Sequence, residues 1–95
     1  MAKVVLASAL TRHLPDASGP GEIALQAPGT MLSDALDAVF ARYPRLRGYV
    51  LDEHGGVRHH VAIFVDGTAL RDKAHPQAAL AQNSEIYIMQ ALSGG

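Results

Sequence analysis

Hydrophobic and polar residues alternate along the first part of the chain in a way that is typical of β-strands. Residues 3–10 alternate with a period of two, which predicts a strand whose better-buried face excludes Val5. Residues 14–21 are dense in turn formers, and the alternation returns over residues 22–26. We therefore expect an N-terminal β-hairpin. The inward positions are Val4, Leu6, Ser8 and Leu10 in the first strand, and Ile23 and Leu25 in the second.

The spacing of apolar residues then changes to that of a helix. Thr30 follows Pro28-Gly29 and occupies the expected N-cap position of a helix that extends to Tyr43. Pro44 is expected to end this helix, and residues 46–51 to add a short helical turn. The residues at core-facing spacing are Leu32, Leu36, Val39, Phe40 and Tyr43.

The second half of the chain returns to strand patterns. Residues 52–56 predict an exposed turn, and residues 59–65 a strand with Val61, Ile63 and Val65 on one face and Ala62 and Phe64 on the other. Asp66-Gly67 is a hairpin signal that leads into a short return strand over residues 68–70. Residues 71–83 predict a loop with one helical turn, and residues 84–91 a final strand with Ile86 and Ile88 on one face and Tyr87 and Met89 on the other.

This order of elements, β-β-α-β-β-β, predicts an α+β domain in which one main helix covers one face of a mixed sheet. The first and last strands are both apolar and lack edge protection, so we place them side by side and parallel at the sheet centre. Residues 1–91 then form one domain, and residues 92–95 a flexible tail.

Composition excludes several function classes. The 95 residues are 48% hydrophobic and 18% charged, which is typical of one globular domain. The absence of cysteine rules out disulfides, thiolate metal sites and cysteine nucleophiles. The net charge is −1 and the Lys and Arg residues are interpreted as scattered, so we expect no direct nucleic-acid partner. The short apolar run at the N-terminus predicts neither a signal peptide nor a membrane span, and a cytoplasmic location is expected.

Polar residues with catalytic potential are interpreted as solvated. His59 and His60 are neighbours on a predicted strand and would point to opposite faces, while the other three histidines lie in separate loops. The histidines therefore do not show the spacing of a metal-ligand set. Asp52 and Glu53 lie on a predicted turn, where a solvated surface is favoured over acid–base chemistry. An enzyme in its own right is not expected.

The sequence finishes with Ala91-Leu92-Ser93-Gly94-Gly95, of which Ala91 is the last residue of the final predicted strand. Two glycines in succession resist fixation into helix or strand and leave a thin backbone that can enter a narrow active site. The hypothesis is that the carboxylate of Gly95 is the reactive group, with Gly94 allowing close approach.

Taken together, these segments resemble the ubiquitin-like β-grasp sulfur carriers of the MoaD/ThiS family. The resemblance spans nearly the whole chain and combines six features in order. They are the strand leading to Leu10-Thr11-Arg12, the helix from Thr30 to Tyr43, Pro44, the turn at 51–55, the strand and turn at 61–67, and the terminal 91–95. Within the family, the length and residues 51–67 are more similar to carriers for cysteine synthesis or tRNA thiolation than to the short thiazole carrier.

The resemblance implies that Gly95 is adenylated by an ATP-dependent E1-like adenylyltransferase/sulfurtransferase and converted to a thiocarboxylate. A synthase would then accept the sulfur for cofactor, cysteine or thiolated-tRNA synthesis. The chain itself would bind no cofactor and no metal, because ATP would be used by the partner. The sheet face opposite the helix is the expected partner-binding surface. Its residues, with one from the tail, are Val5, Phe64, Tyr87, Met89 and Leu92.

Three alternatives remain open at this point. The chain could be the small subunit of molybdopterin synthase, which acts in molybdenum cofactor biosynthesis. It could be a ubiquitin-like modifier that forms isopeptide conjugates through Gly95. It could also be a β-grasp binding module with an inert tail.

Overall fold

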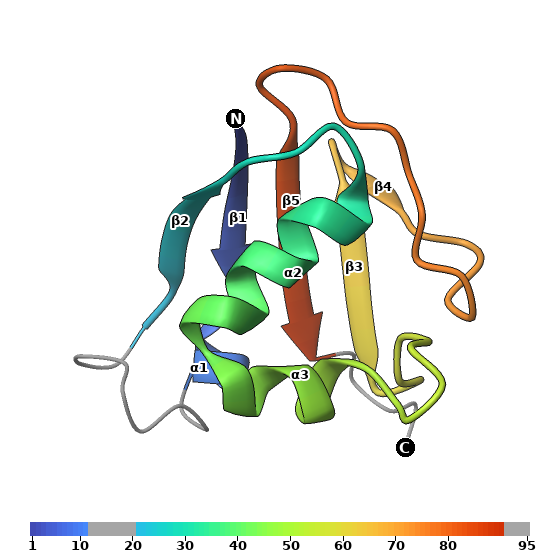
Figure 1. The fold of residues 1–95 in the computed structure, drawn as a ribbon. Helices are drawn as coiled ribbons and strands as arrows, with labels where there is room; N and C mark the ends of the chain where they lie inside the picture. Colours follow the sequence, from blue (N-terminus) through green and yellow to red (C-terminus); the bar gives the residue numbers. More distant parts are fainter. Residues whose placement is uncertain (12–20, 91–95) are drawn as a thin grey trace.

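The computed structural model describes residues 1–11 and 21–90, which form a five-stranded mixed sheet with α2 packed across one face (Figure 1). The strand order is β2-β1-β5-β3-β4. The strands are β1 (Ala2–Leu6), β2 (Ile23–Ala27), β3 (Val61–Val65), β4 (Thr68–Ala69) and β5 (Glu85–Gln90). The helices are α1 (Ser8–Thr11), α2 (Leu32–Arg42) and α3 (Pro44–Val50).

The first and last strands lie parallel to each other at the sheet centre, as expected from their apolar sequences. Val4 is paired with Ile86, and β5 pairs on its other side with β3 in antiparallel orientation. β1 pairs with β2 in the predicted hairpin. The predicted β-grasp fold is thus confirmed.

One hydrophobic core fills the space between the sheet and α2. Alternate residues of the three central strands point toward α2, as the period of two requires. Their partners on the helix recur at helical spacing, so that one face of α2 is buried. The central sheet residues are Val4, Leu6, Val61, Ile63, Ile86 and Ile88, and the helix residues are Leu32, Ala35, Leu36, Val39 and Phe40.

The first strand is shorter than predicted. It ends at Leu6, and residues 8–11 form the short helix α1 instead of continuing the alternation. The backbone N–H groups of Leu10 and Thr11 both donate to Ala7 O, and the Thr11 hydroxyl donates to Gly21 O at 2.6 Å. Leu10, in this helical turn, is completely buried.

The start of the main helix also differs from the prediction. Met31, not Thr30, is the N-cap residue, and no side chain caps the helix. The backbone of residues 78–80 takes that role, because Leu32 N donates to Ala78 O and Leu80 N donates to Thr30 O. This pairing keeps residues 78–80 extended, and the helical turn predicted within 71–83 is wrong.

Pro44 ends α2 as predicted and, at the first helical position, also begins α3. Proline is favoured there because its missing N–H would have no partner inside the helix. The short helix expected over residues 46–51 is confirmed as α3, which starts two residues earlier. Leu46 and Val50 on α3 are buried in the core.

The turn between β3 and β4 is joined to the start of β5 by a small polar network. Asp66 and Gly67 have φ values of 51° and 84°, which confirms the predicted hairpin turn. The Asp66 carboxylate accepts hydrogen bonds from Ser84 Oγ and from Glu85 N, both at 2.9 Å. Ser84 is 2% exposed, and its hydroxyl oxygen accepts a further bond from Ala81 N at 2.8 Å.

We predict that Ser84→Ala lowers the free energy of unfolding by about 1–3 kcal/mol. The substitution removes a nearly buried hydroxyl, so Ala81 N–H and the Asp66 carboxylate each lose a hydrogen bond. Denaturant unfolding followed by circular dichroism measures this change. Ser33→Ala is the control, since Ser33 is exposed on the first turn of α2. Equal stability of the Ser84 and Ser33 variants would show that the network contributes nothing.

The same network predicts a dependence on pH. Hydrogen bonds from Glu85 N and Ser84 Oγ lower the pKa of Asp66. Its contribution to stability is therefore complete above the ordinary aspartate pKa of about 4 and is lost as pH falls through the lower folded value. The Asp66→Asn variant should lose less stability on acidification than the unaltered chain. Thermal melting temperatures measured across this pH range check the difference.

Candidate functional site

The described structure reaches Gln90, so Leu92, Gly94 and Gly95 lie outside the described residues. Two neighbouring regions can be described. One is the end of β5, from which the sequence continues to Gly95. The other is the sheet face opposite α2, where the partner-binding residues were predicted.

Three side chains meet at the end of β5, and we call Tyr49, His60 and Gln90 the tail root. The Tyr49 hydroxyl donates to Gln90 Oε1 at 3.2 Å, which joins α3 to the last residue of β5. The His60 ring packs edge-on against Tyr49, with 5.1 Å between ring centroids and an interplanar angle of 88°. Gln90 is also paired with Val61, the first residue of β3. The end of β5 is therefore held from two sides.

The histidine pair lies just outside the strand on which it was predicted. β3 begins at Val61, so His59 and His60 occupy the preceding turn, with ring centroids 6.3 Å apart. The pKa of His60 is lowered, first by burial and then by the nearby charges of His59 and Arg58. His60 is consequently neutral at pH 7 and contributes a ring contact to the tail root, not a charge.

The sheet face opposite α2 contains the predicted partner-binding residues. Val5 and Phe64 are both paired with Tyr87, so the three side chains project from the same face. Met89 follows two residues later on the same side and is paired with Ala62. Phe64, Tyr87 and Met89 are half-buried, whereas Val5 is only 7% exposed. Val5 therefore supports this surface and offers little area for contact.

Tyr87 is fixed on this face by a hydrogen bond. Its hydroxyl donates to Glu22 Oε2 at 2.8 Å, just before β2 begins. This bond, then burial and the charge of Glu22, raise the pKa of Tyr87. The tyrosine is thus neutral at physiological pH, and its ring presents an apolar surface beside Phe64.

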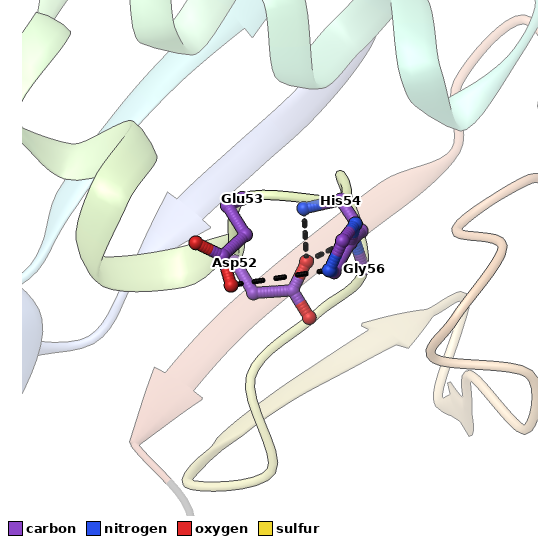
Figure 2. Close-up of polar contacts among 4 residues, drawn as sticks. All are labelled: Asp52, Glu53, His54 and Gly56. Carbon is purple, nitrogen blue, oxygen red and sulfur yellow. Dashed lines mark hydrogen bonds and ion pairs between the residues drawn. The ribbon is translucent and has the colours of Figure 1, made fainter.

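The carboxylates of the turn after α3 contact their own turn. Figure 2 shows Asp52 accepting hydrogen bonds from the backbone N–H of His54 at 2.8 Å and of Gly56 at 3.0 Å. These bonds, Gly56 first, lower the pKa of Asp52. Glu53 lies 3.9 Å from His54 Nε2, with both side chains highly exposed. Asp52 is an ionised turn-forming residue and is poorly suited to proton transfer.

The described residues contain neither a metal-ligand group nor a membrane-spanning helix. Within residues 1–11 and 21–90, no three or more His, Cys, Asp or Glu side chains form a group that could hold a metal ion. In the same residues, no helix has the length and hydrophobicity needed to cross a membrane.

Comparison with known proteins adds to this geometry. The ThiS family model matches residues 10–95. The chain belongs to the ThiS family. Comparison with curated protein sequences finds no match.

Solved structures show the same fold as this ThiS-family chain. SAMP1 from Haloferax volcanii superimposes with a TM-score of 0.71 at 23% identity, covering 99% of this chain and 98% of SAMP1. The Amycolatopsis orientalis BexX/CysO complex gives 0.72 at 17% identity over 97% and 99% of the two chains. Mycobacterium tuberculosis CysO gives 0.71 at 19% identity over 94% and 99%. At these identities the likeness supports the fold alone.

Sequence reasoning missed two features of this ThiS-family chain. The tail root joins Tyr49 to Gln90, 41 positions away, and packs His60 against Tyr49, and no local pattern indicates either contact. The other feature is an exposed set of arginines at the same end of the sheet, on and beside α3. The sequence did contain a signal for it, since no acidic residue occurs between Asp37 and Asp52. This set comprises Arg42, Arg45, Arg47 and Arg58.

Proposed function

We propose that this chain is a sulfur carrier whose C-terminal glycine, Gly95, is adenylated by an ATP-dependent E1-like enzyme and converted to a thiocarboxylate. The thiocarboxylate would donate its sulfur to a synthase in cofactor, cysteine or tRNA-thiolation biosynthesis. The supporting observation is that the family match extends through residue 95 and so includes Gly94-Gly95. This chemistry would take place in the cytoplasm, where ATP is available to the partner.

The chemistry divides between carrier and partner. A carboxylate is a poor electrophile, and its reaction with ATP forms an acyl adenylate and releases pyrophosphate. A hydrosulfide equivalent supplied by the partner then attacks the acyl carbon and expels AMP, which leaves the thiocarboxylate. The carrier contributes the acyl group and its presentation. Asp52 and the histidines near the end of β5 form the turn and ring contacts described above.

The described fold is suited to presenting a reactive terminus. β5 lies in the sheet interior, bonded to β1 on one side and β3 on the other. Its last residue is further fixed by Tyr49. Only four residues lie between Gln90 and Gly95, so a partner that binds the domain has Gly95 within a short reach of a rigid support.

A second candidate function uses the same terminus. Two of the similar solved structures are small archaeal modifier proteins, from Haloferax volcanii and Methanosarcina acetivorans. This likeness favours a ubiquitin-like modifier as the alternative, in which a lysine amine of a target protein attacks the acyl carbon of the Gly95 adenylate, expels AMP and forms an isopeptide bond. Conjugates would appear as a ladder of higher-mass species that react with an antibody to this chain.

The intact mass of the protein from its native host tests the proposal. We expect a species heavier by one oxygen-to-sulfur exchange, and we expect tandem mass spectrometry to place the exchange at Gly95. Protein incubated with the host's activating enzyme and sulfur donor, but without ATP, is the control. An unmodified terminus in complete mixtures with ATP would contradict the sulfur-carrier function.

Gly94→Val should reduce activation at least about tenfold, because a β-branched side chain widens the tail next to the reacting carboxylate. Pyrophosphate release by the activating enzyme measures the effect. Ala91→Val is the matched control, since it adds a valine side chain three residues earlier. Equal rates for the Gly94 variant and the unaltered chain would show that tail width is unimportant.

Phe64→Ala should weaken binding of the activating enzyme about tenfold or more, because Phe64 is a half-buried aromatic side chain on the proposed partner face. Phe64→Leu, which retains an apolar side chain, should bind more tightly than Phe64→Ala. Isothermal calorimetry gives the affinities, and circular dichroism establishes that both variants fold. A folded Phe64→Ala variant with unchanged affinity would remove Phe64 from the interface.

A further inference from the structure

Half of the cationic side chains of this chain surround a single short helix. Four of the eight Lys and Arg residues are Arg42, Arg45, Arg47 and Arg58. The first three lie at the end of α2 and on α3. Arg58 follows α3 in the sequence and is held against it by a hydrogen bond, in which Arg58 Nε donates to Gly48 O at 2.9 Å. All four side chains are exposed. We call this set the arginine cluster.

The arginine cluster has no carboxylate partner within the described residues. In residues 1–11 and 21–90 the ion pairs join histidine to Glu53 or Asp72, and none involves an arginine. Asp37, Asp52 and Glu53 are the nearest carboxylates along the chain. Backbone hydrogen bonds from Gly56 and His54 lower the pKa of Asp52, and the charge of Arg58 helps to lower it without forming an ion pair in the described residues. Asp52 accepts two backbone hydrogen bonds of its own turn, and Glu53 lies beside His54. The positive charge of the cluster is therefore available to another molecule.

The position of the cluster relates it to the reactive tail. α3 runs along the end of the sheet at which β1 and β5 finish (Figure 1). The hydrogen bond from Tyr49 to Gln90 fixes α3 against the last residue of β5. Any protein that binds Gly95 in its active site must approach this end of the domain, because Gly95 is five positions after the last residue of β5.

We propose that the arginine cluster docks onto a carboxylate-rich surface of the enzyme that activates Gly95. This inference rests on the proposed function. Guanidinium groups form bidentate hydrogen bonds with carboxylates and accelerate encounter by long-range attraction. An RNA surface is disfavoured, because the whole chain carries a net charge of −1 with nine acidic residues that phosphates would repel.

The arginine cluster and the apolar face would contribute to binding in different ways. The apolar face, with Phe64 and Tyr87, supplies area that is buried after contact. The arginine cluster steers the carrier so that the end of β5 leads into the active site. Charge reversal should therefore act on affinity and its salt dependence and leave the turnover of bound carrier unchanged.

The test compares the double variant Arg45→Glu/Arg47→Glu with the unaltered chain. The host's E1-like activating enzyme is titrated with labelled carrier, and pyrophosphate release is measured with ATP. At low salt we expect the Kd and KM of the variant to rise about tenfold or more with unchanged kcat, and the difference to shrink at high salt as charges are screened. Arg71→Glu, an exposed arginine after β4, is the matched control and should stay within about twofold.

Each outcome bears on a stated proposal. If the double variant matches the unaltered chain in Kd and in salt dependence, the docking proposal is wrong even though activation of Gly95 stands. If the unaltered chain binds the enzyme but forms no adenylate, the proposed function is wrong. The Kd values of the unaltered chain and the double variant then decide the docking proposal by themselves. If the unaltered chain does not bind, both fail. Loss of affinity for host tRNA with unchanged enzyme affinity would assign the cluster to RNA and overturn the proposal.

The melting temperatures of the Arg45/Arg47 variants show whether a loss of affinity comes from a loss of stability. Arg47 lies in the last turn of α3, where its charge is favourable to the helix. Arg45→Gln/Arg47→Gln removes both charges without adding carboxylates, and it should show a smaller rise in Kd than the Glu pair. A rise that follows melting temperature instead of charge would contradict docking.

Discussion

The parallel pairing of β1 with β5 is the constraint on which the rest of the structure depends. It brings residues from the two ends of the sequence into register at the sheet centre, with Val4 opposite Ile86. A parallel pair needs a long crossover, and here the whole intervening chain provides it, with α2 packed on one face. Every other strand is then placed by reference to this pair, β2 beside β1 and β3 beside β5.

The same pairing decides where function can lie. Because β5 is bonded on both sides, its backbone is unavailable to a partner as an edge. Near this strand, the sheet face opposite α2 and the point at which β5 ends can be reached by a partner. The network of Asp66 and Ser84 fixes the start of this strand, and Tyr49 holds its last residue. The strand that precedes Gly95 is thus constrained at both ends, while the proposed reactive group is a few residues further along the chain.

Much of the fold could be predicted from the sequence, because strong periodicity and turn chemistry are local. The helical spacing of Leu32, Leu36 and Val39 and the Asp66-Gly67 turn predicted elements that the structure confirms. The errors occur where tertiary contacts override local preference. Thr30 is a good N-cap residue, yet its carbonyl accepts a bond from Leu80, a residue 50 positions away, and the helix starts later. Alternation in residues 3–10 continues past Leu6 although the β1 ladder ends there.

The candidate site divides in the same way. Strand parity was sufficient to place Phe64, Tyr87 and Met89 on one face, because a period of two fixes orientation once a strand is known. Parity could not show that Val5 is nearly covered, since burial depends on neighbours such as Tyr87 across the sheet. The arginine cluster could be identified only from the sequence and the tertiary contacts together. A run without acidic residues is visible in the sequence, but only the bond from Arg58 to α3 and the contact of Tyr49 with Gln90 relate that charge to the end of β5. The charge therefore lies at the end of β5 and the apolar face lies along that strand, an arrangement suited to the proposed carrier if its partner recognises the domain and Gly95 together.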